Sequence, residues 1–397
     1  MDSLNLLSSK KVDYFSINQK DQKGKKLRKC ILISLTFLFT SDIFTKYFIF
    51  NLNKKVNIKN MNNEFPYISK RNKKIDIDNE YNINKLDKPF NKNNNINNKN
   101  SNLIEEYINR QKNFCNNPDK FYIQKFEELI KLTQFSFRNI SYKIYTYNKN
   151  IDGMSNEIIK TAKYEPEHMS NFLGALKFYG KKNKINRNKD IFMLDIGGNL
   201  GVYPSFLGKF GYSILTFEAS PRNSYIIYKN YCLINKNSNI IIVNKGLSSE
   251  EKTCNYYSQI KAIGNGVVLC NENKKITKSG NLNLQKTFEV KLTKLSNFLP
   301  YLSNKKIALI KLDIEGGEGK VIEDAIELIN KYHVPFIFSE FDPKYLMKQG
   351  TNPKKYIELF TNNGYKISYK GFLTKDYINP KEIKSIHYNL YFIYDGI

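Results

Sequence analysis

Short apolar runs alternate along the second half of the chain with stretches whose apolar residues recur at helical spacing. Buried strands are predicted for the runs at 191–196, 213–218, 240–244, 306–313 and 335–340, and helices for 222–235, 317–332 and 353–363. Two more runs, 365–369 and 386–394, have no helical pattern between them and predict an antiparallel pair at one sheet edge. The alternation predicts an α/β fold: a seven-stranded, doubly wound, Rossmann-like sheet, mostly parallel, with an antiparallel C-terminal strand.

The chain in front of this region carries weaker signals. We expect a helix from Phe126, a strand over 141–147 and a helix that begins near Asn171. Residues 248–290, between the third and fourth strands, show neither periodicity, so we expect an irregular insertion there. Loops that follow strand ends often carry specificity, which makes this insertion a candidate for the substrate side of a site.

The first 50 residues have the pattern of a membrane leader. Residues 1–29 are polar and end in a basic cluster, and the apolar character that begins at residue 30 extends to residue 50. Asp42 and Lys46 interrupt this span, and a charge near a helix centre costs roughly 2.5–3.5 kcal/mol. Because the basic flank comes first, we favour a single-pass signal anchor over 30–50, with a cytosolic N-terminus and the remainder in the lumen of the secretory pathway. A cleaved signal peptide, an amphipathic leader and a cytoplasmic protein stay open as alternatives.

Residues 51–118 are rich in Asn and Lys. Such a composition buries too little apolar surface to offset the entropy of the chain, so we expect a disordered stem. The predicted folded domain is 119–397, with its core over 165–370. The domain contains one glycosylation sequon, Asn139-Ile-Ser141, which has meaning only if the domain is lumenal.

Composition changes this picture little. A formal net charge of +26 is typical of nucleic-acid or membrane binding, but Lys is enriched throughout, including the segments expected to be disordered, so the charge does not identify a partner. The hydrophobic content of 41% suffices for a core. The five cysteines form no C-x-x-C pair and no zinc spacing. Cys254 and Cys270 are candidates for a disulfide in an oxidising compartment or for buried thiols.

The chemistry centres on Asp195-Ile-Gly-Gly-Asn-Leu-Gly201, which follows the predicted strand 191–196 and precedes a segment of helical spacing. Glycines at such a strand–turn–helix junction let the main chain approach a ligand closely, and the start of the helix attracts an anion. The glycines alone are equally compatible with an ordinary tight turn.

The neighbouring strand ends favour a ligand site. Ligands of doubly wound sheets bind outside the carboxyl ends of the strands, and Asp195, Glu218, Asn244, Asp313 and Glu340 each end a predicted strand. Glu218 follows the glycine turn by about twenty residues, the spacing of a carboxylate that binds ribose hydroxyls. The carboxylate of Asp195 repels a pyrophosphate, which disfavours a nicotinamide-dependent reductase. It suits a cationic nucleoside such as S-adenosylmethionine.

Four segments resemble, in order, the motifs of the FkbM family of S-adenosylmethionine-dependent methyltransferases: Asp195–Gly201, Phe217-Glu-Ala-Ser-Pro221, Asn244-Lys-Gly-Leu-Ser248 and Lys311-Leu-Asp-Ile-Glu-Gly-Gly-Glu318. The resemblance covers residues 165–370 and is most specific in the last motif. It implies the seven-stranded methyltransferase fold and methylation of hydroxyl groups, often on sugars or secondary metabolites.

The resemblance also assigns residues to the cofactor. Asp195, Gly197 and Gly201 would bound its methionine end, with Asn199 in the same turn, and Glu218 would hold its ribose. Asn244 and Gly246 would lie near its adenine, and Asp313 would face the methionine end and the reacting centre. Other methyltransferases often have glycine at the position of Asn199.

A hydroxyl acceptor must be aligned with the methyl donor and must lose a proton to a base or a metal-bound group. Candidate bases are Asp313, Glu315, Glu340 and His168, of which His168 is favoured as structural. Glu315 and Glu318 also suit the N-terminal end of the following helix, and for Glu318 this role is the preferred interpretation. No His/Asp cluster in the sequence requires a metal, and we expect none.

The leading hypothesis is therefore a membrane-anchored O-methyltransferase that acts on a glycan or a small hydroxylated molecule. A nucleic-acid methyltransferase is less favoured, because the fourth strand ends in Leu312-Asp-Ile-Glu315 and not in the Asn/Asp-Pro-Pro-aromatic run of amino-methylating enzymes. A third hypothesis is an anchored protein that has kept the fold without the activity. The intact acids and glycines argue against it.

Overall fold

The structure, a computed structural model, describes residues 102–234, 239–259, 262–270, 284–383, 386 and 388–396. The predicted tail over 1–29, the signal anchor over 30–50 and the stem up to residue 101 lie outside the described residues. Within the described part, no helix is both long enough and apolar enough to cross a membrane.

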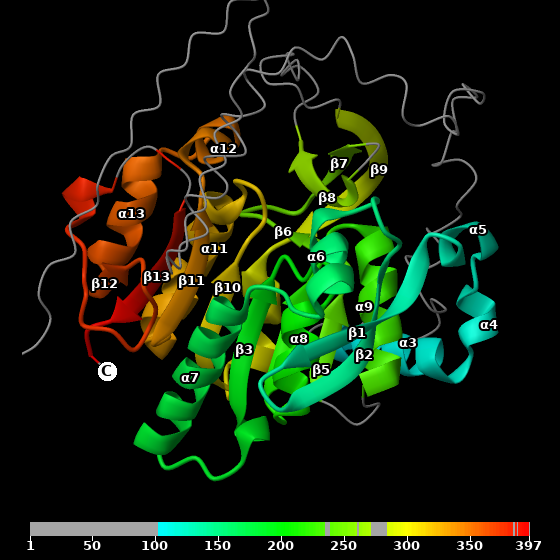
Figure 1. The fold of residues 1–397 in the computed structure, drawn as a ribbon. Coiled ribbons are helices and arrows are strands. Elements are labelled where there is room, and N and C mark those ends of the chain that lie inside the picture. Colours follow the sequence, from blue (N-terminus) through cyan, green and yellow to red (C-terminus); the bar gives the residue numbers. More distant parts are fainter. Residues whose placement is uncertain are drawn as a thin grey trace, which may run out of the picture. The chain divides into compact units, whose positions relative to one another are not determined.

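Seven strands form the central sheet, in the order β12-β13-β11-β10-β3-β4-β5 (Figure 1). Neighbours from β11 to β5 are parallel, whereas β13 is antiparallel to both of its neighbours. The bounds are β3 Ile191–Ile196, β4 Ser213–Phe217, β5 Ile240–Val243, β10 Lys306–Leu312, β11 Phe336–Phe341, β12 Tyr365–Ser368 and β13 Tyr388–Tyr394. The seven strands and the antiparallel C-terminal pair are confirmed. After β3 the chain adds β4 and then β5 on one side of the sheet, and after β10 it adds β11 on the other side. The carboxyl ends of β3 and β10 therefore flank the switch point of the sheet.

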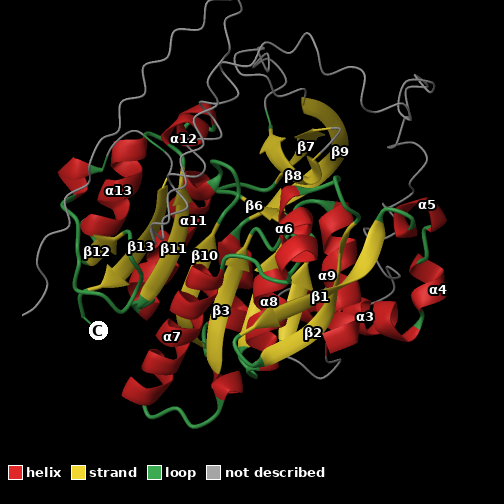
Figure 2. Cartoon of the chain, viewed as in Figure 1, coloured by secondary structure: helices red, strands yellow, loops and turns green. Residues whose placement is uncertain are grey.

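Helices cover both faces of this sheet (Figure 2). The side chains of β3 alternate between two apolar cores, with Met193 in one and Leu194 in the other. The first core includes α7 Pro166–Lys182, α8 Val202–Lys209 and α9 Pro221–Ile234. The second includes α11 Glu318–Tyr332, α13 Pro353–Thr361 and the first half of α3 Asn102–Asn116. The predicted helices after β4, β10 and β11 are confirmed.

Side-chain caps fix where three of the helices begin. Asn352 accepts hydrogen bonds from the N–H groups of the second and third residues after it, at the start of α13. Asp342 does the same for α12 Pro343–Lys348, and Asp152 caps α6 Gly153–Thr161. Short helical segments complete the connections: α4 Pro118–Phe121, α5 Gln124–Glu127, η3 Asn188–Asp190, η4 Leu295–Phe298, α10 Leu299–Leu302 and η5 Pro380–Glu382.

The expected disorder over 51–118 is wrong for residues 102–116, which form α3. Ile104 and Tyr107 are buried, and the side chain of Gln111 donates to the main-chain oxygen of Ile240 at 2.8 Å and accepts from the N–H of Ile242 at 3.2 Å. The helix therefore covers the edge strand β5, and the folded domain begins at or before residue 102. Tertiary contacts outweigh the polar composition of this segment.

Two further expectations need correction. The helix that begins near Phe126 ends at Glu127, and the chain then forms a hairpin of β1 Ile130–Phe137 and β2 Ile140–Tyr147. The insertion over 248–290 is not irregular, because most of it belongs to a four-stranded sheet in the order β6-β9-β7-β8. Its strands are β6 Gly246–Leu247, β7 Lys252–Gln259, β8 Ala262–Leu269 and β9 Leu284–Thr293. This second sheet lies at the top of the view in Figure 1.

Two disulfides connect these elements. Cys115 in α3 is bonded to Cys232 in α9, and Cys254 in β7 is bonded to Cys270, which follows β8. The structure thus settles the open alternative for Cys254 and Cys270 in favour of a disulfide.

Candidate functional site

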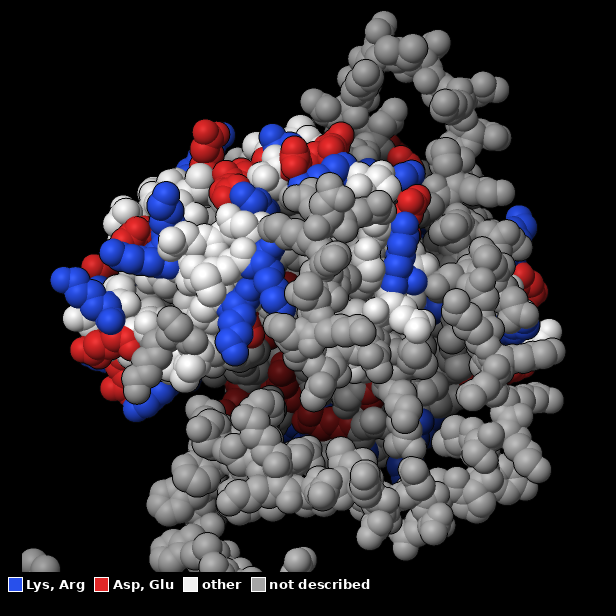
Figure 3. All heavy atoms as spheres, turned by 90° about the horizontal axis from the view of Figure 1, so that it is seen from above, with Lys and Arg blue, Asp and Glu red and all other residues white. Residues whose placement is uncertain are grey.

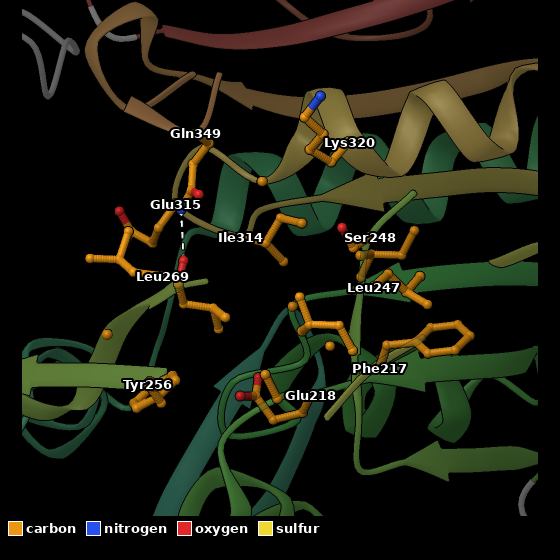
Figure 4. A pocket seen from close by; sticks show the side chains of 18 of the residues that line it. Phe217, Glu218, Leu247, Ser248, Tyr256, Leu269, Ile314, Glu315, Lys320 and Gln349 are labelled. Atoms are coloured by element: carbon orange, nitrogen blue, oxygen red, sulfur yellow. Dashed lines mark hydrogen bonds between the residues drawn. The ribbon is translucent and has the colours of Figure 1, made fainter. Parts of the chain in front are cut away.

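A cavity of about 300 Å³ lies where the carboxyl ends of the central strands meet the second sheet. Its walls come from the ends of β3, β4 and β10, from β6, and from β7 and β8. Figure 4 shows Glu218 and Tyr256 on one side of this cavity and Gln349 and Lys320 on the opposite side. The four predicted motifs all contribute residues to its wall, at the edge of the sheet where such folds bind ligands.

The glycine turn after β3 approaches β10 so closely that a side chain has no room. Gly197 has φ +90°, and a Cβ atom there would lie 2.0 Å from the main-chain oxygen of Asp313. The N–H groups of Gly197 and Gly198 both donate to the oxygen of Phe217, at 3.0 and 2.9 Å. Gly201, with φ +74°, starts α8 and lies against Ile227. The turn is thereby fixed against both neighbouring strands, with the main chain of Gly197 in the cavity wall.

Glu218 is the buried carboxylate of the cavity, 7% exposed at the end of β4. Its Oε2 accepts a hydrogen bond from the N–H of Asn199 at 2.7 Å, and its Oε1 accepts one from the N–H of Ser220 at 2.7 Å. Burial raises the pKa of this carboxyl to about 7, against the lowering effect of these two N–H groups. Each oxygen keeps a lone pair with which it can accept a further donor.

Asp195 is fully buried and, unlike Gly197 and Glu218, is not among the described residues of the cavity wall. Its Oδ2 accepts from the hydroxyl of Thr216 at 2.7 Å, and its Oδ1 lies 3.6 Å from Nζ of Lys311. Burial raises the pKa of Asp195, and the Lys311 ammonium opposes this increase. The carboxylate therefore lies behind the turn and supports it.

Of the remaining predicted cofactor residues, some line the cavity, as Glu218 does, and others lie outside its described wall, as Asp195 does. Asn199, Gly246 and Asp313 line the cavity. Gly201 and Asn244 are not among the described residues that do so. Asn244 is 6% exposed, and its Nδ2 atom has no hydrogen-bond partner within the part of the chain that the structure describes.

Acidic side chains gather after β10. Asp313 is 40% exposed, and its Oδ2 lies 3.4 Å from Nζ of Lys311. Glu315 lines the cavity from a left-handed backbone conformation, with φ +58°. Burial, and then the carboxylates of Asp313 and Asp342, raise the pKa of Glu315 to about 7. A carboxyl with this pKa can accept a proton near neutral pH.

Glu318 lies in the first turn of α11, at the helix end where we expected it. Its Oε1 accepts a hydrogen bond from the N–H of Ile314 at 2.8 Å, in the loop that precedes α11. The side chain is almost completely buried, and burial raises its pKa to about 8. The N–H of Ile314 lowers this pKa, whereas the nearby carboxylates of Asp313 and Glu315 raise it further.

Glu340 and His168 are not among the described residues of the cavity wall. Burial, and then the carboxylate of Asp313, raise the pKa of Glu340 well above its usual value, and its side chain hydrogen-bonds to Asp313. The two ring nitrogens of His168 contact the hydroxyl of Tyr391 and, at 3.0 Å, the side-chain amide of Asn389. His168 therefore connects α7 to β13, in agreement with a structural role.

The sequence placed the insertion over 248–290 on the substrate side of the site, and it does line the cavity, but sequence reasoning missed the strands that form this roof. The second sheet supplies Tyr256, Gly264 and Leu269 to its wall. Nδ2 of Asn223 donates to the oxygen of Gly264 at 2.9 Å, and Nε2 of Gln349 donates to the oxygen of Val268 at 2.8 Å, the dashed line in Figure 4. β8 is thus attached to both sides of the site. The spacing of Cys254 and Cys270, which are paired in the structure, was a signal in the sequence that this insertion is ordered.

Among the described residues, no group of three or more His, Cys, Asp or Glu side chains is arranged to hold a metal ion.

Comparison with known families decides the class of this site. The methyltransferase FkbM domain matches residues 195–367, a range that contains all four motifs. Residues 195–367 are an FkbM methyltransferase domain. FkbM domains belong to the S-adenosylmethionine-dependent methyltransferases, and the chain is an enzyme of this class. The resemblance drawn from the motifs is confirmed.

Solved structures similar to the chain that carries this FkbM domain include a precorrin-6y C5,15-methyltransferase from Geobacter metallireducens GS-15, at 13% identity and a TM-score of 0.31. The similarity covers 62% of this chain and 97% of that one. A second is a SAM-dependent methyltransferase from Agrobacterium tumefaciens, at 9% identity and a TM-score of 0.32. That similarity covers 67% of this chain and 71% of the other. The comparison with curated proteins found no match.

Proposed function

We propose that this enzyme binds S-adenosylmethionine in the cavity and methylates a hydroxyl group of a glycan or a small molecule. The observation that carries the proposal is the placement of Glu218. It is a buried carboxylate in the cavity wall, connected through a 2.7 Å hydrogen bond to the glycine turn. A ribose presents two adjacent hydroxyl donors, and two carboxylate oxygens with free lone pairs match them.

The glycine turn supports the same ligand. The missing side chain at Gly197 lets the main chain form the cavity wall, next to the acidic Asp313. S-adenosylmethionine, when bound, supplies the methyl group on a positively charged sulfur. In our proposal, Gly197, Asn199 and Asp313 contact its methionine end, Glu218 its ribose and Gly246 the surroundings of its adenine. Asp195, Gly201 and Asn244 contribute from behind the wall.

Glu315 is the proposed general base. It lines the cavity, and its pKa of about 7 lets the carboxylate take up a proton near neutral pH. Asp313, two residues earlier, holds the positive end of the ligand. Glu340 lies outside the described wall and is hydrogen-bonded to Asp313, so we assign it the orientation of that side chain. In each turnover, the acceptor hydroxyl would give its proton to Glu315 while its oxygen takes the methyl group. The carbon–sulfur bond would break with its electron pair left on the sulfur, which leaves as the neutral thioether, and Glu315 would then release its proton to water.

The size and charge of the site favour a small acceptor group. A cavity of about 300 Å³ under a roof of β-strands, which also has to hold the cofactor, leaves room for only a small part of an acceptor. In the view from above, Lys and Arg side chains are interspersed with acidic and neutral ones, and some acidic side chains lie recessed in a hollow (Figure 3). A continuous basic surface, which nucleic-acid binding needs, is not visible on the described part of this face.

We also propose that residues 30–50 anchor the enzyme in a membrane of the secretory pathway, with the domain in the lumen. The two disulfides support an oxidising compartment, because such bonds are rare in the cytosol.

The proposed function is tested in two steps with the full-length protein. Isothermal titration with S-adenosylmethionine is expected to show binding at one site per chain. Tritium-labelled S-adenosylmethionine is then added to a lysate of cells that lack the protein, with and without the purified enzyme. We expect label in glycans or small molecules. The absence of binding would refute the cofactor site, label in RNA or DNA would refute the acceptor class, and binding without any transfer would indicate an inactive protein.

A further inference from the structure

Lys311 is a lysine in the middle of the sheet. It lies in the buried strand β10 and is 2% exposed. In the strand register Lys311 is opposite Asp195 of β3, and Asp195 is opposite Thr216 of β4. Residues opposite each other on neighbouring strands project from the same face, so these three side chains form a polar row across three strands. A lysine is almost never fully buried unless it is paired.

The Lys311 ammonium has three neighbouring acceptors. Nζ donates to the main-chain oxygen of Gly197 at 2.8 Å, and it lies 3.6 Å from Oδ1 of Asp195 and 3.4 Å from Oδ2 of Asp313. The ring of Tyr203 lies beside it, with its centroid 5.5 Å from Nζ. Burial lowers the pKa of Lys311, but the nearby carboxylates, above all those of Asp313 and Asp195, raise it above its usual value. The side chain is therefore a cation.

Two of these acceptors belong to the cavity wall, and the third does not. Gly197 and Asp313 line the cavity, whereas Asp195 lies behind it. One buried cation thus joins the glycine turn of β3 to the acid that follows β10. Without this cation, the carboxylates of Asp195 and Asp313 would face each other through a poorly solvated space, and the oxygen of Gly197 would lose its donor.

We propose that Lys311 is a positioning residue of the methyltransferase site, which holds the Gly197 turn and the Asp313 carboxylate in the geometry that binds the cofactor. The inference rests on the proposed function for the identity of that cofactor. Lys311 could have a simpler role, from which the proposed one must be distinguished: it would only neutralise the buried charge of Asp195. That role stabilises the fold but has no separate effect on the site.

A double substitution separates the two roles. Lys311→Met removes the cation and keeps the length of the chain, but it leaves Asp195 charged and unpaired, so a lower melting temperature is expected. Asp195→Asn combined with Lys311→Met removes both charges and keeps an oxygen that can accept from Thr216, so the melting temperature is expected to recover. Lys354→Met serves as the matched control, because Lys354 is 86% exposed on α13.

The measurement is isothermal titration of each full-length variant with S-adenosylmethionine, alongside its melting temperature. We expect the double variant to melt near the wild type but to bind at least about tenfold more weakly than Asp195→Asn alone, the loss of one charged contact. An affinity of the double variant equal to that of Asp195→Asn would overturn the inference, since neutralisation of Asp195 would then be the whole role of Lys311. A double variant that does not recover its melting temperature would also overturn it, because the contact would then serve folding. If the wild type itself binds no S-adenosylmethionine, the first titration shows that the proposed function has failed, and this inference fails with it.

Discussion

The N–H of Asn199 donates a 2.7 Å hydrogen bond to Oε2 of Glu218, although the two residues belong to different motifs. Asn199 lies in the turn after β3, with φ +48°, and Glu218 directly follows β4. This bond makes the turn and the buried carboxylate one structural unit. A ligand that contacts the turn therefore also meets a carboxylate whose position is already fixed, which reduces the ordering cost of binding.

Substitution of Glu218 is expected to remove most of the affinity for S-adenosylmethionine. In Glu218→Gln, the side-chain amide replaces one oxygen, so a backbone N–H loses its acceptor and the ligand loses a charged partner. We expect the Kd of the full-length protein, measured by isothermal titration, to rise by about 10- to 100-fold. Glu358→Gln is the control, since Glu358 lies on α13 and its side chain is 46% exposed. Equal affinities of the two variants would exclude Glu218 from the site.

Substitution of Glu315 is expected to affect turnover and not affinity. Because the carboxylate is the form that accepts a proton, the wild-type rate should rise with pH through about 7, the pKa of this group. Glu315→Gln should lower kcat by about 10²- to 10⁴-fold and abolish this rise, while the Kd for S-adenosylmethionine changes by less than about threefold. The pH–rate profile with the identified acceptor checks this. A profile of Glu315→Gln that still rises through pH 7 would assign the proton transfer to another group.

The stability of the fold is expected to fall as the pH rises, partly because of Glu318. The pKa of this carboxyl is about 8 in the fold and 4.5 ordinarily, so the folded state holds the proton more tightly. Its contribution is complete below pH 4.5 and is lost as the pH rises to about 8, with a slope of at most about 1.4 kcal/mol per pH unit. Glu318→Gln keeps the acceptor for Ile314 and removes the titration. Its melting temperature should therefore rise relative to the wild type between pH 5 and pH 8. A constant difference across this range would contradict the prediction.

Both disulfides are expected in the isolated protein. Peptide mapping without a reductant should recover the pairs Cys115–Cys232 and Cys254–Cys270. The second pair closes a loop with a sequence separation of 16, so replacing both of its cysteines by serine should cost about 3 kcal/mol of unfolding free energy in urea. Since Cys270 also lines the cavity, the same variant should bind S-adenosylmethionine more weakly. Cys30→Ser is the control, and free thiols at 254 and 270 would refute the pairing.

A lumenal domain is expected to be glycosylated at Asn139. This residue is exposed in the turn between β1 and β2, and Ser141, the third residue of the sequon, is exposed as well. In a eukaryotic host, enzymatic removal of N-glycans should increase the electrophoretic mobility of the wild type and of Ser141→Thr, which keeps the sequon. Asn139→Gln and Ser141→Ala should show no shift. A wild type without a shift would count against the lumenal location.

The central sheet could be predicted because its strands are almost uniformly apolar. All residues of β3, β4 and β5 are buried, and each run ends at a glycine or a polar residue within one or two positions of the observed boundary. Five of the eight predicted cofactor residues line the cavity: Gly197, Asn199, Glu218, Gly246 and Asp313. Parallel strands bring their carboxyl ends to one edge, so position along the chain sufficed for these residues.

The strands of the roof and the helix α3 could not be predicted, for opposite reasons. In β8, Gly264 and Gly266 replace the side chains whose alternation identifies a strand, because Asp152 and Tyr256 fill the space next to them. In α3, a few apolar residues such as Tyr107 are enough to hold the helix on β5, although they are surrounded by polar residues. The role of Lys311 depends on strand register. A sequence pattern does not contain register, although a lysine inside an apolar run was a visible anomaly.

The bond between Cys115 and Cys232 has a consequence for proteolysis. It joins α3 to α9 across 117 positions of the chain, and the hairpin of β1 and β2, α7 and the glycine turn all lie inside the loop that it closes. A protease that cuts once within this loop leaves two fragments that stay covalently joined until a reductant is added. A cut before Cys115 separates everything upstream of it from the catalytic domain. If the N-terminal segment holds the enzyme on a membrane, only the second kind of cut sheds it.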